Sequence, residues 1–469
     1  MDNFHIFRRT AARSSRAGKL LNDPVDAYRP LLATWLIEMI LSLGWYKKAF
    51  CETHEYIFNA ESFAVITQIA VKSTAQSSAG GYIFINGKKI QHGDMASAKM
   101  LKVHLESFRN LPITDELSLL KNICTIGRIL GLNDAEMSIL CFAAMLNVFP
   151  VFYAALASVC YRTSLQHFAS IIALISGQSA ALIMSGLEEG SPLISSGIIA
   201  VESGGVDIEQ RVTLLSGFGE ILCRAHKSVG ALLEQFLKKA GAPSLKLEDF
   251  PHLSLDIRTV MDYLQGVSRS AEPGANILFY GAPGTGKTEC VKALAAALEI
   301  DLFEISFANE DGNPIGGNDR LRAYNLCQRA LRSSNNALLM FDEIEDVFPS
   351  EGGFMALFGL ESASETCKSG KAWINRTLER NHTPAIWVTN DAHIDPAYLR
   401  RFDYSIRFSV PPQQVRMSIA RHHLAQFEPS DAWLARIAAS DQVIPAQYER
   451  AAKVARLSCN QDMARARLP

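Results

Sequence analysis

The chain has 469 residues, and at about 150 residues per domain this length predicts roughly three structural units. Its 46 Lys and Arg residues nearly balance its 48 Asp and Glu residues, which argues against binding to nucleic acid or to an anionic membrane through overall charge. Nine cysteines are scattered without the close pairs that bind zinc or carry out redox chemistry. We therefore expect reduced, mostly buried thiols and a cytoplasmic protein.

Residues 1–24 form the first segment of the chain. Between Arg8 and Lys19 it contains Arg, Ser and Ala but no acidic residue. This composition is similar to that of an organelle transit peptide, which stays open as an alternative. Our first expectation is a basic flexible arm.

Residues 25–240 show apolar clusters at helical spacing, separated by Gly- and Pro-containing breaks. The pattern predicts a mostly α-helical N-terminal domain, to which we assign the binding of a client or partner. Four helices are expected within it, at residues 116–130, 136–145, 165–175 and 178–184.

One part of this domain could also cross a membrane. Residues 137–161 contain no charged side chain and are long enough to span a bilayer. Asn147 and Pro150 lie near the middle of this stretch, and residues 165–187 are rich in Ser, Gly and Gln. We expect buried helices of a soluble domain in both stretches, with transmembrane helices as the alternative.

The character of the sequence changes at residues 239–243, a Gly- and Pro-containing break that we interpret as a linker. Beyond it, strand-like runs alternate with loops and helical runs. This alternation predicts a parallel β-sheet with crossover helices, the architecture of an α/β protein.

A glycine-rich turn in this second half has the pattern of a phosphate-binding loop. The strand-like run 276–280 leads into Gly281–Thr288, and a helical run from Val291 to Leu298 follows. Backbone N–H groups of such a turn and the positive end of the helix dipole would bind phosphate oxygens. Lys287 would neutralise the β- and γ-phosphates and the Thr288 hydroxyl would bind Mg²⁺. The predicted nucleotide-binding residues are Gly281, Ala282, Pro283, Gly284, Thr285, Gly286, Lys287, Thr288, Glu289 and, from the next motif, Asp342.

About fifty residues further on, the uncharged run 337–341 ends in Asp342 and Glu343. Because carboxyl ends of parallel strands lie at the ligand-binding edge, both acids should emerge beside the phosphate loop. Asp342, with Thr288, would hold Mg²⁺, and Glu343 would polarise the attacking water. We attribute no role in the site to the acids at 345 and 346, which also fit a solvated turn.

A third strand-like run, residues 385–389, ends in Asn390, whose amide could bridge the γ-phosphate and the attacking water. Residues 395–403 follow and contain Arg400 and Arg401. An arginine too far from its own nucleotide can reach that of a neighbouring subunit and speed hydrolysis. A surface ion pair with Asp403 is the alternative for the arginines, and a simple turn is the alternative for Asn390.

Taken in order, these motifs resemble the AAA family of ring ATPases across residues 247–411. The resemblance implies an α/β P-loop NTPase module of the AAA+ type, followed by a small helical lid at residues 412–469. It implies an ATPase that uses ATP and Mg²⁺, assembles as a homo-oligomeric, hexameric ring, and remodels a protein or another macromolecular client. Because the sequence has no basic stripe interleaved with aromatic residues, we expect no nucleic-acid client, and we expect no membrane contact. The resemblance also implies that Asn390 is sensor 1 and that Arg400 and Arg401 are finger candidates. More loosely, the whole chain is similar to bacterial SpoVK-like AAA proteins with a helical N-terminal region.

Two features depart from the family pattern. Members that thread a client have an aromatic residue in the loop after the second strand, whereas residues 309–317 have Pro314 at that place. The predicted lid is also short, and we assign no arginine in it to a second sensor position. A nucleotide-gated assembly scaffold with slow or no hydrolysis therefore stays open as the alternative function.

Overall fold

The computed structural model describes residues 24–43, 60–69, 71–74, 82–85, 88–91, 95–111, 117–157, 164–202, 211–270, 272–306, 315–332, 334, 336–346, 377–379, 381–390, 400–440 and 443–458. Its contacts divide the chain into two compact units, Met1–Leu232 and Leu233–Pro469. Each unit is described by itself. Residues 1–23 of the basic arm, Pro314 and the last eleven residues lie outside the described residues, so the predictions made for them stay predictions.

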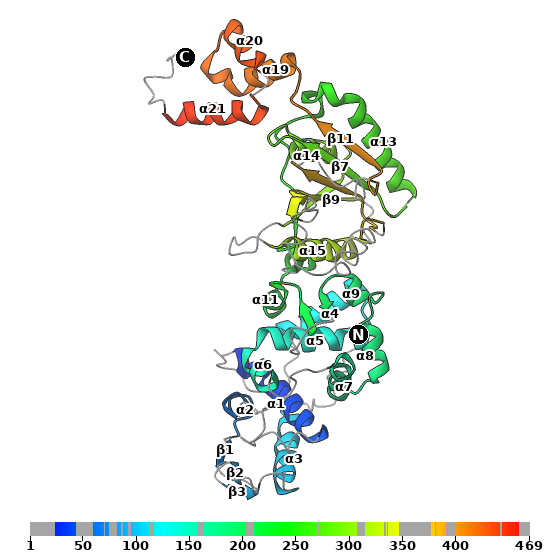
Figure 1. Cartoon of the computed structure of the whole chain (residues 1–469), viewed down its shortest axis with the longest axis vertical. Coiled ribbons are helices and arrows are strands. Elements are labelled where there is room, and N and C mark those ends of the chain that lie inside the picture. Colours follow the sequence, from blue (N-terminus) through cyan, green and yellow to red (C-terminus); the bar gives the residue numbers. More distant parts are fainter. Residues whose placement is uncertain are drawn as a thin grey trace, which may run out of the picture. The chain divides into compact units, whose positions relative to one another are not determined.

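The first unit is mainly helical, as expected (Figure 1). Its helices are α1 (Pro24–Ser42), α2 (Ala60–Thr67), α3 (Met95–Arg109), α4 (Ser118–Leu130), α5 (Asp134–Val148), α6 (Pro150–Ala157), α7 (Leu165–Ser176), α8 (Ala180–Gly186), α9 (Pro192–Ser195), α11 (Phe218–Cys223) and α12 (Val229–Leu233). Its strands are β1 (Val71–Thr74), β2 (Tyr82–Ile85), β3 (Lys88–Gln91), β4 (Ile199–Val201) and β5 (Val212–Leu214), which form one antiparallel three-stranded sheet and one antiparallel pair.

The break between α4 and α5 shows how local chemistry sets these boundaries. Gly131 ends α4 with φ of 66°, a left-handed conformation that glycine adopts without steric cost. Asn133 then caps α5, and Glu136 completes a capping box by bonding back to the Asn133 N–H. The Glu136 carboxylate is fully buried and also accepts from the N–H of Leu193. This side chain therefore satisfies donors at the starts of α5 and α9.

The two uncharged stretches of this unit form bent helix pairs. Helices α5 and α6 meet at 103°, and α7 and α8 meet at 117°. Among the described residues, no single helix is long and apolar enough to cross a membrane, although both bent pairs have the length and composition to do so.

The second unit is built on a six-stranded sheet in the order β11-β7-β10-β9-β8-β6. The strands are β6 (Leu237–Lys239), β7 (Asn276–Gly281), β8 (Asp301–Ile305), β9 (Ala337–Phe341), β10 (Ala385–Thr389) and β11 (Tyr404–Phe408). Five strands are parallel, as predicted, and only β6 runs antiparallel to its neighbour β8. The chain thus joins this sheet at residue 237, and β6 ends at residue 239, where the predicted linker begins.

Helices cover both faces of the sheet (Figure 1). They are α13 (Ser254–Ser270), α14 (Lys287–Ala297) and α15 (Gly317–Ala330), and short 3₁₀ turns occupy Leu247–Asp249, Pro251–Leu253 and Ile344–Asp346. Apolar side chains of α13 and α14 form one core with alternate strand residues such as Ile277 and Met340. The opposite face packs on α15, where the ring centroid of Tyr324 lies 4.9 Å from that of Trp387 and 6.0 Å from that of Phe341.

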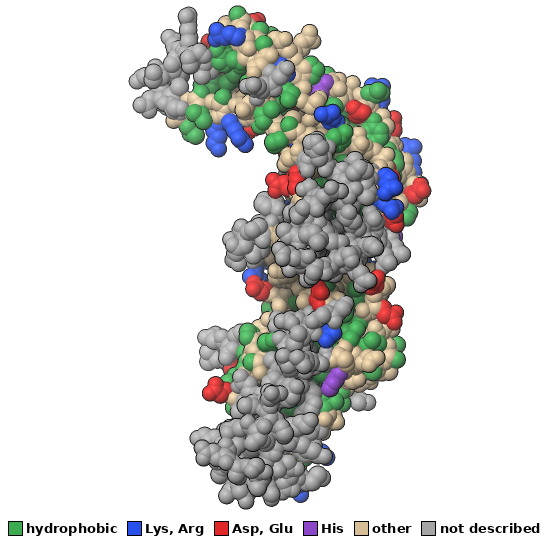
Figure 2. Space-filling view, viewed as in Figure 1, with side chains coloured by type: hydrophobic (Ala, Val, Ile, Leu, Met, Phe, Trp, Pro, Cys, Tyr) green, Lys and Arg blue, Asp and Glu red, His purple; other side chains and the backbone are tan. Residues whose placement is uncertain are grey.

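A small helical lid follows the sheet. It consists of α19 (Gln413–Leu424), a 3₁₀ turn (Ala425–Phe427), α20 (Asp431–Ala439) and α21 (Pro445–Ser458). Its core contains buried Ala420, Leu434 and Tyr448. Val454 and Leu457 on α21 are 65% and 76% exposed, and Figure 2 shows hydrophobic and basic side chains beside one another on the surface of the lid.

Candidate nucleotide-binding site

The predicted phosphate loop links the buried strand β7 to the start of α14. Gly281 has φ of 139°, and a Cβ atom there would lie 2.2 Å from the carbonyl oxygen of Phe408 on β11. Only glycine fits such a close approach in this backbone conformation. The loop ends at Gly286, which precedes the first residue of α14, so the helix N-terminus faces the loop.

The Lys287 side chain is almost fully buried within the loop, at 5% exposed. Its Nζ donates to the carbonyl oxygens of Gly281 and Ala282, each at 2.8 Å, and to Oδ1 of Asn390 at 3.0 Å. Burial lowers the pKa of Lys287, although the carboxylates of Asp342 and Glu345 oppose this by favouring the charged form. A buried ammonium group at this place is suited to an anionic ligand, since burial of charge is costly unless the charge is compensated.

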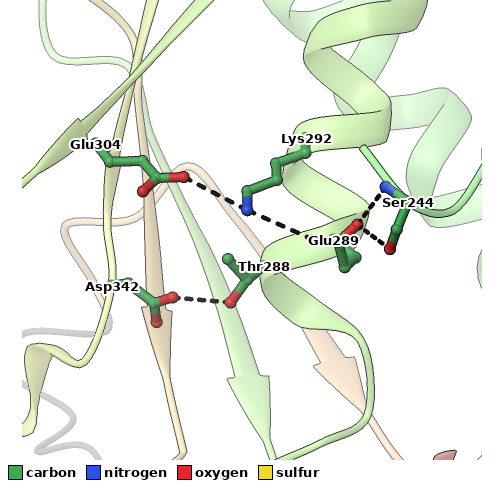
Figure 3. A network of polar contacts seen from close by, with 6 residues as sticks. All are labelled: Ser244, Thr288, Glu289, Lys292, Glu304 and Asp342. Carbon is green, nitrogen blue, oxygen red and sulfur yellow. Dashed lines mark hydrogen bonds and ion pairs between the residues drawn. The ribbon is translucent and has the colours of Figure 1, made fainter. Parts of the chain in front are cut away.

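Thr288 and Asp342 meet across the sheet edge, 54 positions apart in the sequence. The Thr288 hydroxyl donates to Oδ2 of Asp342 at 2.8 Å (Figure 3). Asp342 Oδ1 accepts from the N–H of Glu343 at 2.9 Å. A hydroxyl and a carboxylate are the hard oxygen ligands that Mg²⁺ prefers, so this pair fits the metal expected at the site.

Glu343 follows β9 and is exposed. Its φ of 53° lies in the left-handed region, which is uncommon for any residue other than glycine. Strained backbone of this kind tends to occur at functional sites and persists only where the surroundings enforce it.

Glu289 lies on a different side of α14 from Thr288 (Figure 3). Its Oε2 accepts from the N–H and the hydroxyl of Ser244, at 2.7 and 2.6 Å, and Lys292 lies 3.5 Å from its other oxygen. Burial raises the pKa of Glu289, but the hydrogen bonds from Ser244 and the charge of Lys292 outweigh burial and hold this pKa below 4.5. Glu289, a predicted nucleotide-binding residue, is thus bonded to Ser244, in the segment between β6 and α13.

Asn390 lies at the end of β10, beside Lys287, and Glu345 holds its backbone. Glu345 Oε1 accepts from the Thr389 hydroxyl at 2.9 Å and also from the N–H of Asn390. Glu345, to which the sequence pattern assigns no role, thus connects the turn after β9 to the end of β10. Sequence spacing gave no signal for this, because the two segments are 45 positions apart.

A second residue not expected in the site is Arg320, on α15. This side chain is 2% exposed, and it donates to the backbone carbonyl oxygens of Asp342 and Glu343. It lies in a helical run that looks like ordinary amphipathic sequence, so no motif could have indicated the contact.

Arg400 and Arg401 lie at the opposite edge of the sheet from the phosphate loop. They precede β11, whose first residue, Tyr404, pairs with Ile277 near the start of β7. The phosphate loop begins at Gly281, four residues further along β7, which at about 3.3 Å per residue is about 13 Å away. Neither side chain is therefore brought to the nucleotide site of its own subunit.

The partners of this segment differ from the ion pair considered above. Arg401 pairs with Glu379. The Asp403 carboxylate instead accepts from the Tyr263 hydroxyl and the N–H of Asn276, each at 2.8 Å. Asp403 thus fixes the start of β11 against β7.

The start of α21 in the lid contacts the phosphate loop. The N–H of Ala446 donates to the carbonyl oxygen of Gly284 at 3.3 Å. A Cβ atom on Gly284 would lie 2.9 Å from side-chain atoms of both Ala446 and Ile444. The residues that approach the loop from the lid are thus small or apolar.

Comparison with known proteins agrees with this geometry. Residues 277–410 match the model of the ATPase family associated with various cellular activities (AAA). The chain is 30% identical over 172 residues to the ATP-dependent zinc metalloprotease FtsH of Malacoplasma penetrans, covering 35% of this chain and 20% of that protein. It is 26% identical over 251 residues to the cell division cycle protein 48 homolog of Archaeoglobus fulgidus, covering 50% of this chain and 33% of that protein.

A third relative is a putative 26S proteasome regulatory subunit homolog of Methanocaldococcus jannaschii, 29% identical over 164 residues, with 34% of this chain and 43% of that protein covered. The chain thus spans less than half the length of each of these relatives. Among solved structures, a chain of the HORMA:CdnC:Trip13 complex of E. coli MS115-1 matches 44% of this chain at 16% identity with a TM-score of 0.33.

The parallel sheet and its loops define a P-loop ATPase domain of the AAA+ type, with a helical region before it. The match to the AAA family model covers residues 277–410 and therefore identifies this domain of the chain. ATP and Mg²⁺ are the cofactors of this domain.

Proposed function

We propose that the chain hydrolyses ATP as one subunit of a homo-oligomeric ring and uses the energy to remodel a protein client. The observation that supports this best is the hydrogen bond between Thr288 and Asp342, together with buried Lys287. These three groups, from one strand end and one helix start, converge where a metal-bound triphosphate would be held.

In this proposal each residue has a distinct task. Lys287 exchanges at least one of its three present acceptors for phosphate oxygens, because an ammonium group has three donors. Thr288 and Asp342 hold Mg²⁺, which supplies charge neutralisation during phosphoryl transfer. Glu343 orients and polarises the attacking water. Asn390, once released by Lys287, offers its amide to the γ-phosphate and that water.

The remaining cationic group would come from a neighbouring subunit. Arg400 and Arg401 precede Tyr404, which lies about 13 Å along β7 from the phosphate loop of its own subunit, so they are at the far end of the strands from that loop. An arginine supplied by a neighbour can increase turnover by about 10³- to 10⁵-fold. We therefore assign these residues to the next subunit of a ring, which we propose to be hexameric.

A nucleotide-gated scaffold is the second candidate, and one observation favours it. Arg401 is already engaged by Glu379 within its own subunit. If this ion pair persists after assembly, Arg401 is unavailable to the neighbour and hydrolysis stays slow.

Steady-state ATPase assays of the purified chain and its Glu343→Gln variant separate the two functions. We expect measurable turnover that the variant lowers by at least about 100-fold, while Mg-ATP binding is retained. Glu379→Gln is a useful companion, because it should raise turnover if the ion pair restrains Arg401. Turnover that is absent in all three proteins would leave only the scaffold.

The shared site is tested by mixing inactive subunits. Lys287→Ala subunits lack nucleotide binding but retain the arginines, and Arg400→Ala/Arg401→Ala subunits have the reverse defect. Mixed rings should recover part of the activity, since some sites combine an intact loop with an intact arginine. No recovery, despite co-assembly shown by light scattering, would contradict a site shared between subunits.

The helical first unit is the part that we propose to select the client. We also place the protein in the cytoplasm and expect no nucleic-acid client. Capture by a Glu343→Gln variant held with Mg-ATP, compared with the same variant carrying Lys287→Ala, identifies nucleotide-dependent clients. The similarity to SpoVK-like proteins stays a prediction.

A further inference from the structure

The backbone at Asp342 and Glu343 has an unusual shape that one side chain of α15 matches. In an extended strand, successive carbonyl groups point to opposite neighbours. Here the carbonyl oxygens of Asp342 and Glu343 both accept from the guanidinium group of Arg320, the second at 2.8 Å. The left-handed φ of 53° at Glu343 accompanies this change in carbonyl direction.

Arg320 is held firmly enough to impose that shape. The side chain is 2% exposed, and its guanidinium carbon lies 4.6 Å from the ring centroid of Phe341, the last residue of β9. That ring is itself stacked on Trp387, with centroids 4.9 Å apart and planes inclined by 17°. A planar guanidinium can stack on an aromatic ring and bond two acceptors at fixed spacing, which the single ammonium of lysine cannot do.

We infer that Arg320 is a positioning residue that fixes the Asp342–Glu343 turn, and through it the carboxylate of Glu343. This rests on the proposed function for the role of that carboxylate, although the effect on the turn is independent of it. Arg320 bonds the turn through its backbone carbonyl oxygens, so it should affect the chemical step more than nucleotide binding. The binding groups of Lys287 and Thr288 belong to a different element, α14.

Arg322 offers a matched control on the same helix. It is also buried, at 5% exposed, and it forms an ion pair of 2.9 Å with Asp319. Arg322→Met therefore removes a buried arginine from α15 and leaves the two carbonyl contacts of Arg320 in place. Any general effect of losing a buried charge should therefore appear equally in Arg322→Met and in the corresponding variant Arg320→Met.

The test compares the full-length protein with Arg320→Met, Arg320→Lys and Arg322→Met. Hydrogen exchange of the peptide covering residues 341–346, without nucleotide, reports the turn itself. It should become at least about tenfold faster in Arg320→Met, because the donors that hold both carbonyl groups are gone. The kcat should fall by about 10- to 100-fold, the size expected for a misplaced catalytic group, while the Kd for Mg-ATP stays within about threefold.

Arg320→Lys should give a smaller change of the same kind, and Arg322→Met should leave exchange and kcat within about threefold of the original protein. Unchanged exchange at 341–346 in folded Arg320→Met, or equal effects of Arg322→Met, would overturn the inference. If Arg320→Met does not fold, Arg320→Lys is compared with Arg322→Met by the same criteria. If the original protein shows no turnover, the proposed function fails, and exchange alone still decides whether Arg320 holds the turn.

Discussion

Replacing Gly281 with alanine tests whether the phosphate loop depends on the close approach of β11. An added methyl group would lie 2.2 Å from the Phe408 carbonyl oxygen and 2.9 Å from its carbon, both of which are backbone atoms. No side-chain rotation can relieve such a contact, so β11 or the loop must move. The φ of 139° adds strain of its own, because residues with a Cβ atom rarely adopt it.

The expected cost follows from these two contributions. Backbone strain costs about 1–3 kcal/mol and overpacking about 1–3 kcal/mol, so the variant should lose about 4 kcal/mol of unfolding free energy. At about 2–4 °C per kcal/mol for a unit of this size, its Tm should fall by about 8–16 °C. Gly266→Ala is the control, because Gly266 lies exposed inside α13 with nothing within 4 Å of an added Cβ. That change should raise stability by about 0.5–1 kcal/mol.

Differential scanning calorimetry measures both variants. The transition of the ATPase domain is identified as the one that Mg-ATP shifts upwards in the original protein, since a ligand stabilises the unit that binds it. We also expect Gly281→Ala to weaken Mg-ATP binding, because the displaced loop presents its N–H groups poorly. A decrease in Tm of less than about 2 °C for Gly281→Ala would refute the reasoning, since about 1 kcal/mol cannot accommodate both strain and overlap.

Three further predictions concern charged groups of the site. Burial lowers the pKa of Lys287 against the influence of two carboxylates, and only the protonated form of Lys287 attracts phosphate. Mg-ATP affinity measured by calorimetry should therefore begin to fall with rising pH below 10.5, and Lys287→Arg should remove that decrease. Glu345→Gln weakens the charged hydrogen bond to the Asn390 N–H, so kcat should fall about tenfold with little change in Kd, and a normal kcat would contradict a role for Glu345 in holding Asn390. The pKa of Glu289 is held below its ordinary value of 4.5. The stabilisation that the Glu289 carboxylate contributes to the fold is therefore complete above pH 4.5, and it is lost as the pH falls through the lowered pKa. In urea denaturation at pH 7, the free energy of unfolding of Glu289→Gln should be about 1 kcal/mol lower, because its bonds to Ser244 are weaker. Between pH 7 and pH 3 this free energy should also fall less steeply in the variant than in the original protein. An equally steep fall in both proteins would contradict a contribution of the Glu289 carboxylate to acid stability.

The parts of the site that the sequence predicts are those whose shape is set locally. The run Asn276–Thr288 contains a buried strand, a glycine turn and a helix start in one continuous segment, and it folds in that way. The alignment of Asp342 and Asn390 beside it follows from a single topological fact, the parallel order of β7, β10 and β9. Strand pattern and strand direction are therefore sufficient to bring together residues more than fifty positions apart.

The parts that the sequence does not predict depend on packing between segments. Arg320 reaches Asp342 and Glu343 across 22 and 23 positions, from a helix whose periodicity does not distinguish a buried guanidinium from a solvated one. Strand β6 has three residues, too few for alternation to be recognised, and it is defined only by its pairing with β8. In both cases the determining interaction is with a distant neighbour, about which local propensity contains no information.

Asp342 connects the two faces of the sheet through different atoms. Its carboxylate is bonded to Thr288 on α14, which packs on one face, and its carbonyl oxygen is bonded to Arg320 on α15, which packs on the other. A shift of α14 on nucleotide binding must therefore act on the carboxylate, whereas a shift of α15 must act on the backbone that leads to Glu343. Because both movements converge on one residue, metal binding and alignment of the water-polarising carboxylate can be coupled without any contact between the two helices.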